Sequence, residues 1–220
     1  MTDTLIIKKA IEEVESKTFG VTEQFLDIHQ LIYENEKPKI ARIDKEKNDG
    51  TVIVYFPVKG ERFFLAVGLD TIPEVSVSWV DTENYCCVYF RAYSDNLSLE
   101  QLSQMTTLKS TGGRCKGTPR RPIGGTGILW KQSTIFFEPN PEADEFNDKL
   151  KKLLDYLEQD KVGVAKLVNE ASGYIQVAIE FHNGNTMLGG PHIDLEHIKR
   201  MANLNLEINF DLYVSGNKFK

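Results

Sequence analysis

A strand–helix–strand pattern occurs twice in the second half of the chain, and this internal repeat restricts the fold more than any other feature of the sequence. The helical segments 98–105 (SLEQLSQM) and 194–201 (DLEHIKRM) align, and each begins with a residue that favours a helix N-cap. The strand-like segments that precede and follow these helices are 85–93, 127–137, 174–181 and 206–214. The sequence therefore predicts two β-α-β units.

A long amphipathic segment connects the two units. Asn140 is a suitable N-cap for it, and Pro141 is a suitable first-turn residue. Its apolar stripe consists of Phe146, Leu150, Leu153, Leu154 and Leu157. Two β-α-β units joined by a helix predict an α/β (α+β) fold of the ferredoxin-like type, with a four-stranded sheet and helices on one face.

The first 81 residues predict a helix followed by short strands. Residues 5–18 have a helical period, and a weaker helical stretch reaches Ile32. Four β-like runs follow, at 40–44, 51–58, 62–69 and 75–80. We expect an N-terminal helix with an antiparallel β-meander. The polar residues 81–84 mark the expected boundary between a domain of residues 1–81 and a domain of residues 82–220.

Several short motifs in the second half carry a family resemblance. Lys116 and Gly117 follow the first helix, Trp130 and Ser133 belong to the next strand, and the long amphipathic helix and the closing segment 195–213 complete the pattern. With these features, residues 85–216 resemble the bacterial family of domains of unknown function that is numbered four-two-seven-nine. The resemblance implies a small bacterial α/β domain without an established activity. Because some such families lie beside toxin genes as immunity proteins, it also suggests an antitoxin-like binding role.

Charge and cysteine usage limit the function classes. The chain has 26 basic and 32 acidic residues, a net charge of −6, which disfavours nucleic acid and anionic membranes as partners. No apolar run reaches the length of a membrane-spanning helix, and the N-terminus does not resemble a signal peptide. Cys86, Cys87 and Cys115 fit neither a disulfide scaffold nor a zinc motif, which favours a soluble protein of the reducing cytoplasm.

The glycine-rich segment 112–127 forms a basic loop without an acidic residue. Its cations and the one that follows could bind an anion or an acidic partner: Arg114, Lys116, Arg120, Arg121 and Lys131. Gly112 and Gly117 have the spacing of a phosphate-binding P-loop, but Thr118 stands where that motif needs lysine. The structural alternative is a loop whose cations pair with the acidic residues Glu138, Glu142, Asp144 and Glu145.

The sheet face opposite the helices is a second candidate surface. We expect it to carry Tyr89, Arg91, Tyr93, Tyr174, Asp211 and Tyr213. Tyrosine and arginine are enriched where proteins bind one another. The alternative is that residues 1–81 cover this face.

No catalytic signature is present in the sequence. His182, His192 and His197 fall within one segment, but their spacing matches no metal-ligand motif, and we expect neither a metal nor a cofactor. Cys115 lies between two cations, yet no histidine is placed beside it by the sequence. The leading hypothesis is a non-catalytic module that binds another protein in an immunity or regulatory role. The alternative is a nucleotide- or anion-binding protein or enzyme that uses the basic loop. The oligomeric state stays open.

Overall fold

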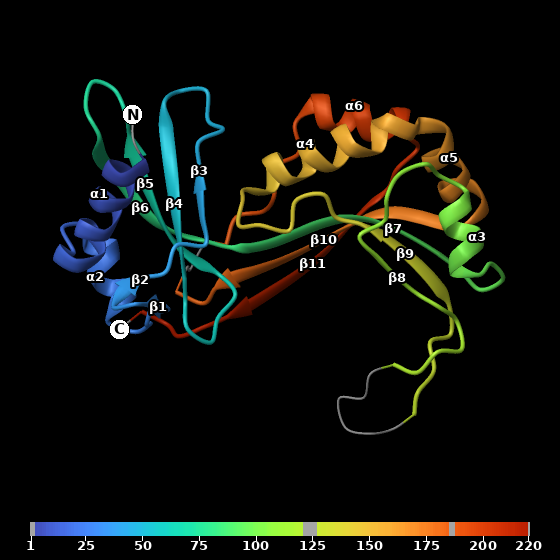
Figure 1. Ribbon diagram of the computed structural model, residues 1–220, viewed down its shortest axis with the longest axis horizontal. Coiled ribbons are helices and arrows are strands. Elements are labelled where there is room, and N and C mark those ends of the chain that lie inside the picture. Colours follow the sequence, from blue (N-terminus) through green and yellow to red (C-terminus); the bar gives the residue numbers. More distant parts are fainter. Residues whose placement is uncertain (1–2, 121–126, 185–187, 220) are drawn as a thin grey trace.

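The computed structural model describes residues 3–120, 127–184 and 188–219 and contains two large sheets that lie side by side, together with a short two-stranded sheet (Figure 1). The chain passes from the first sheet to the second at Asn84, because β6 ends at Glu83 and β7 begins at Tyr85. Residues 81–83, which the sequence suggested as a polar break, therefore continue a strand. The mixed α/β (α+β) class is confirmed.

The first sheet is an antiparallel meander in the order β3-β4-β5-β6, as predicted. Its strands are β3 (Arg42–Asp44), β4 (Thr51–Pro57), β5 (Phe64–Asp70) and β6 (Ser76–Glu83), and β1 (Tyr33–Glu34) pairs with β2 (Lys37–Pro38) beside it. Helices α1 (Asp3–Ser16) and α2 (Gly20–Leu26) bury their apolar residues against this sheet. The carboxylate of buried Glu13 accepts hydrogen bonds from the Phe19 amide at 3.1 Å and the Thr22 hydroxyl at 2.6 Å, which fixes the start of α2.

The second sheet has five strands in the order β11-β10-β7-β9-β8. They are β7 (Tyr85–Ser94), β8 (Gly112–Arg114), β9 (Ser133–Phe137), β10 (Ser172–His182) and β11 (Ile208–Ser215). Only the β10–β11 pair is parallel. Four helices, α3 (Leu99–Gln104), α4 (Phe146–Leu157), α5 (Lys161–Glu170) and α6 (Leu195–Asn203), contribute buried residues to one core with the sheet, and the turn η1 (Glu158–Asp160) joins α4 to α5.

Period-two alternation decides which side chains enter this core. In β7, Val88 and Phe90 are buried against the helices, whereas Tyr89 and Arg91 point to the opposite face. The same alternation holds in β10, where Val177 belongs to the core. The predicted apolar stripe of α4 is fully buried at Leu150, Leu153, Leu154 and Leu157. The helices therefore cover one face of the sheet, as expected, and no helix of the described residues covers the other, the open face.

The ferredoxin-like arrangement is present, but it uses other strands than the sequence predicted. A split β-α-β-β-α-β fold separates its parallel strands by an intervening antiparallel strand. Here β7, α3, β8, β9, the helices α4 and α5, and β10 follow one another along the chain, and the strand order β10-β7-β9-β8 places β9 between the parallel strands β7 and β8. The second predicted β-α-β unit differs, because β10 and β11 are direct parallel neighbours and β11 lies outside the ferredoxin-like set.

In the second half, strand β8 and helix α5 were missed, and the start of α4 was misplaced. Strand β8 was read as loop because glycines disfavour strands, but Gly113 is required there: a Cβ atom would lie 2.5 Å from Leu99 of α3. It makes the sheet five-stranded instead of four-stranded. Helix α5 was not predicted. Helix α4 begins at Phe146, not at Pro141, because Asn140 donates a hydrogen bond to Asp144 at 2.6 Å and holds residues 140–145 as a loop.

The C-terminal tail returns to the first sheet and joins the two halves. Phe219 packs against the core of the first sheet, and Asn217 donates a hydrogen bond to the Ile28 carbonyl at 2.9 Å. Beside it, the Nε2 atoms of His29 and His182 are 2.8 Å apart, and both side chains are buried. The two sheets are therefore connected by side-chain contacts as well as by the chain at Asn84.

Candidate binding site

The basic loop of the sequence is a β-hairpin arm that projects from β8 and β9 (Figure 1). Residues 115–120 and 127–132 of this arm are described. Backbone hydrogen bonds join its two sides, from the Gly117 amide to the Trp130 carbonyl at 2.8 Å and from the Arg120 amide to the Ile128 carbonyl at 2.8 Å. The arm is anchored at its base, where the Lys116 ammonium donates to the Asp95 carbonyl at 2.6 Å. Lys116 therefore holds the arm in place and does not line the pocket described next.

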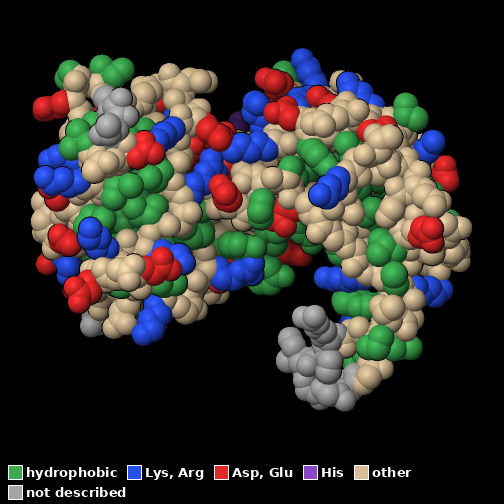
Figure 2. Space-filling view, in the orientation of Figure 1, with side chains coloured by type: hydrophobic (Ala, Val, Ile, Leu, Met, Phe, Trp, Pro, Cys, Tyr) green, Lys and Arg blue, Asp and Glu red, His purple; other side chains and the backbone are tan. Residues whose placement is uncertain are grey.

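A pocket of about 570 Å³ lies where the arm meets the open face of the second sheet. The sheet contributes Arg91 from β7, Arg114 from β8 and Thr134 from β9. The arm and its neighbours contribute Asp95, Arg120, Ile128, Leu129, Trp130, Lys131 and Gln132. Figure 2 shows the molecule hollowed on this side, between the N-terminal half and the arm. The pocket thus unites two groups of residues that the sequence left separate, the basic loop and the tyrosine-rich face.

Aromatic rings hold the guanidinium groups of the pocket. The Arg114 and Arg120 guanidinium carbons lie 4.2 and 4.3 Å from the ring centroid of Trp130. Arg91 lies over Tyr93 and Tyr174, at 5.1 and 5.7 Å. Cation–π contact orients these groups and leaves their N–H donors free for another acceptor.

Arg91 has a hydrogen-bond donor that is both buried and unused by the described residues. Its Nε atom is buried and has no hydrogen-bond partner among the described residues. A buried N–H without an acceptor costs free energy that a bound anion would recover. Burial of Arg114, followed by the charges of Arg91 and Arg120, lowers the pKa of its guanidinium. The three arginines therefore repel one another, and an anion between them would relieve that repulsion.

The structural alternative for the basic loop does not hold for its described cations. Within the described ranges, no ion pair joins Arg114, Lys116, Arg120 or Lys131 to a carboxylate. Three of the four acidic residues expected to pair with them, Glu142, Asp144 and Glu145, pair with cations of the first half instead, and Glu138 accepts a hydrogen bond from the Cys87 thiol at 3.1 Å. Asp144 pairs with Arg42 at 2.7 Å, and Glu145 pairs with Lys47 at 2.6 Å. Arg121 lies outside the described residues.

The remaining residues of the open face lie beside the pocket or beyond it. Tyr93 and Tyr174 pack edge to face at 6.2 Å, and Tyr89 packs against Phe136 at 5.9 Å. Asp211 and Tyr213 are exposed on β11, which β10 separates from β7. Contacts from the first half reach this face near one end, where Arg62 stacks on Tyr85 at 3.6 Å. Pocket residues such as Arg114 and Arg120 stay exposed, so the first half does not cover the pocket.

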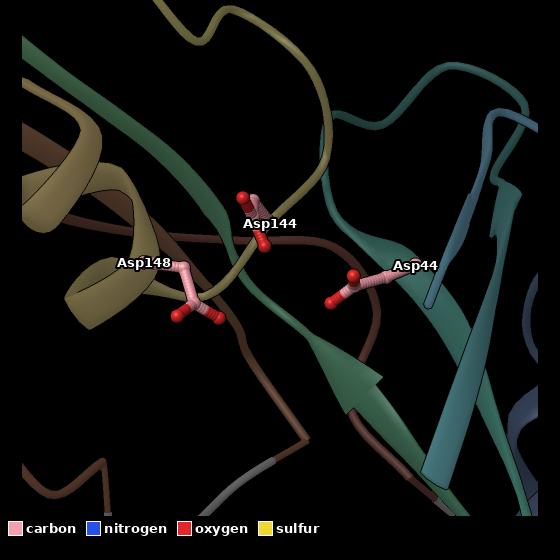
Figure 3. Close-up of side chains that lie close together, drawn as sticks. All are labelled: Asp44, Asp144 and Asp148. Atoms are coloured by element: carbon pink, nitrogen blue, oxygen red, sulfur yellow. The ribbon is translucent and has the colours of Figure 1, made fainter. Parts of the chain in front are cut away.

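Three carboxylates, those of Asp44, Asp144 and Asp148, meet where the two halves join, with oxygens within 4.8 Å of one another (Figure 3). The arrangement resembles a metal-ion site, but the side chains of arginine and lysine supply the positive charge. Lys47 donates to Asp148 at 2.6 Å, and Asp144 receives Arg42 at 2.7 Å and Lys152 at 2.9 Å. Burial alone would raise the pKa of Asp144, and the hydrogen bonds from Arg42 and Lys152 lower it overall. We assign this cluster to the fold.

The histidines and cysteines that the sequence singled out are dispersed. His182 contacts His29, His197 lies 3.0 Å from its own helix cap Asp194, and His192 is exposed. Burial raises the pKa of Cys86 and of Cys87 to about 12, so neither is a ready nucleophile. Cys115 is exposed in the arm.

Sequence reasoning missed the role of Trp130 as the ring that orders two arginines. The available signal was its position among cations, ten residues after Arg120. Asp95, Gln132 and Thr134 gave no signal, because only the turn after β7 and the pairing of β8 with β9 bring them to the pocket.

Comparison with known proteins gives one match. The family model described as Domain of unknown function (DUF4279) matches residues 83–215, which include the pocket and all five strands of the second sheet. No curated protein and no solved structure matches the chain. Among the described residues, no helix is both long and apolar enough to span a membrane.

Proposed function

Because the chain belongs to the family described as Domain of unknown function (DUF4279), a description that names no activity, we propose its function from the pocket: it is a non-catalytic module that binds an acidic segment of another protein. One observation carries the proposal. Arg91, Arg114 and Arg120 converge on one pocket, and none of the three forms an ion pair with a carboxylate of the described residues.

The chemistry of the pocket suits carboxylates on a polypeptide. Guanidinium groups bind carboxylates in bidentate geometry, and charge-assisted hydrogen bonds are the stronger ones in proteins. The exposed apolar side chains of Ile128 and Leu129 add contact area at its rim. Tyr93 and Tyr174 continue the surface along the sheet, and aromatic residues with arginine are typical of protein interfaces.

A nucleotide is the weaker candidate. Both guanidinium groups already lie against Trp130, which leaves less of the indole for stacking a base. Phosphate-binding glycine loops lead into a helix whose N-terminus faces the phosphate. Here Gly112 and Gly113 belong to β8, and the chain continues into a hairpin.

The biological setting belongs to the same proposal. An immunity or regulatory protein acts by occupying the surface of its partner, which needs binding and no catalysis. The family resemblance suggests a bacterial source. Free Cys86, Cys87 and Cys115 are compatible with the reducing cytoplasm, which is where we place the interaction.

Fluorescence anisotropy with a labelled decaglutamate peptide tests the proposal. We expect the wild-type protein to bind this peptide at low salt and to bind a decaglutamine peptide much less. Arg114→Ala combined with Arg120→Ala should weaken binding at least about tenfold, equivalent to about 1.4 kcal/mol, because it removes two charge-assisted donors. Added salt should weaken binding as well, since the contacts are partly exposed.

A matched control separates the pocket from net charge. Lys8→Ala combined with Lys9→Ala removes the same charge from α1, where both lysines pair with Glu12. This variant should bind like the wild type. Equal weakening by both variants would contradict a pocket-specific site. Displacement of the peptide by inorganic phosphate or ATP at far lower concentrations than by glutamate would favour the anion-binding alternative.

A further inference from the structure

The outer strand of the second sheet, β11, has an edge that nothing covers among the described residues. It stands at the end of the strand order and pairs with β10 alone (Figure 1). Eight consecutive residue pairs join it to β10 without a bulge, so its outer edge is regular. Leu212, Tyr213 and Val214 are 52%, 56% and 50% exposed.

Such an edge is unusual for a protein that stays monomeric. Edge strands are commonly shortened, bent by a bulge, or protected by lysine or proline, because a free row of N–H and C=O groups recruits another strand. β11 has eight residues, and Asp211 is its one charged residue. The opposite edge of the same sheet, β8, has three residues and carries Arg114.

The hydrogen bonds to β10 identify which groups of β11 face outward. The carbonyls of Glu207 and Ser215 accept from β10 and from the residue after it. Backbone groups alternate in direction along a strand, so odd-numbered residues face β10. The N–H and C=O groups of Phe210, Leu212 and Val214 therefore face the free edge.

This alternation limits how a second β11 can pair with the first. In an antiparallel pair, outward-facing residues of one strand lie opposite outward-facing residues of the other. Around a two-fold axis, only two registers overlap over seven residues of the strand. A register centred on Asp211 places two carboxylates opposite each other, which is destabilising. A register centred on Leu212 places Leu212 opposite its copy, Phe210 opposite Val214, and Asp211 opposite Tyr213.

We propose that this chain forms a two-fold symmetric dimer in which β11 pairs antiparallel with β11 of a second copy, centred on Leu212, and joins the two five-stranded sheets into one. The occupant is a second copy because the edge is self-complementary: like charges are kept apart, and apolar residues meet on the helix face. The pocket of each copy lies toward the β8 edge of its sheet and stays open in the dimer.

Helix α6 supports the same assignment. Arg200 on one side of it pairs with Asp155 at 2.7 Å and Glu158 at 2.8 Å, toward α4 and η1. Met201 faces the core. Ile198 falls on the side turned away from α4 by the helical period, and it is 48% exposed. An apolar residue there extends the apolar surface beside the β11 edge.

Light scattering during gel filtration tests the dimer. The wild-type protein should show about 50 kDa, twice the 25.0 kDa of the chain, at high micromolar concentration. Leu212→Lys should reduce the mass to that of one chain, because two lysines would oppose each other across the axis. Val162→Lys, which changes a 70% exposed residue of α5, should leave the dimer intact.

Mixing two variants tests the register and controls for misfolding. Leu212→Lys and Leu212→Glu should each be monomeric alone, and an equimolar mixture should recover the double mass, because lysine then faces glutamate. Recovery requires that both variants fold. A wild-type protein that stays at 25.0 kDa, a Leu212→Lys variant that stays dimeric, or a mixture that stays monomeric would each overturn the proposal.

Discussion

The junction between the two halves and the pocket on the open face both concentrate cations, but they treat them in opposite ways. At the junction, Arg42 pairs with Asp144 at 2.7 Å, and its side chain is 9% exposed. In the pocket, Arg114 and Arg120 contact an indole and no carboxylate, and both are exposed. Each junction cation has an internal partner, whereas the pocket cations have none among the described residues.

The difference distinguishes cations that serve the fold from cations that are available to a ligand. Burying a charge costs several kcal/mol unless a counter-charge is built in. At the junction this cost is offset by built-in carboxylates. Asp144 pairs with Arg42 and Lys152, and Asp148 pairs with Lys47. An exposed arginine has a small desolvation cost, so it needs no internal carboxylate and is available to an external anion. Three predictions can break or sharpen this contrast.

The largest effect is expected at the junction. Asp144→Ala should reduce the free energy of unfolding by about 3–5 kcal/mol, because Arg42 would stay buried without its closest carboxylate. Urea unfolding measures the change. The control is Glu142→Ala, which removes a 67% exposed carboxylate 3.8 Å from the same arginine and should have almost no effect. Similar losses for both variants would show that Asp144 is not the built-in partner.

An intermediate effect is expected at the histidine pair. Burial lowers the pKa of both His29 and His182, and their mutual contact lowers that of His182 further. The Nδ1 atom of His182 accepts a hydrogen bond from the Gly184 amide at 3.2 Å. The Nε2 atom of His182 therefore carries the hydrogen, and this N–H donates a hydrogen bond to Nε2 of His29. Only the neutral pair satisfies this arrangement. Since the unfolded chain binds protons more readily at these two positions, the contribution of the histidine pair to stability is constant above about pH 6.5 and falls as the pH drops below it.

Comparing pH series with a variant isolates that contribution. Between about pH 6.5 and 4.5, the wild type should lose about 1–3 kcal/mol more than His29→Gln combined with His182→Gln. The comparison with a variant is needed because burial raises the pKa of Glu83 to about 8. The contribution of Glu83 to stability therefore increases as the pH falls, and it does so in both proteins. His192→Gln, at an exposed position, should follow the wild type. Parallel curves for the wild type and the double variant would contradict the assignment.

The smallest effect on stability is expected in the pocket. Arg114→Ala combined with Arg120→Ala should change the free energy of unfolding by less than about 1 kcal/mol, because exposed cation–π contacts of about 0.5–1 kcal/mol are opposed by repulsion among the arginines. Thermal and urea unfolding measure it. A loss comparable with that of Asp144→Ala would mean that the pocket arginines serve the fold, and it would remove the contrast between the two regions.

The sequence could predict the elements whose signal is local. Period-two alternation in 85–93 and 174–181 predicted β7 and β10 within two residues at each end. Ser98 and Asp194 predicted the starts of α3 and α6, and both accept the expected backbone hydrogen bond. The weaker signals failed. Gly112 to Arg114 become a strand only because β9 supplies a pairing partner.

The sequence by itself determined the mixed α/β class, the meander, the buried stripe of α4 and the residues that belong to the open face, because each depends on periodicity along the chain. Tertiary structure alone decided the places of β8 and β11 in the second sheet, the separation of paired from unpaired cations, and the meeting of Arg91 with Arg114 and Arg120. Arg91 and Arg114 come from strands that are not neighbours in the sheet and that reach one face through pairing with β9. Contacts between distant segments depend on chain path and burial, which no local pattern encodes.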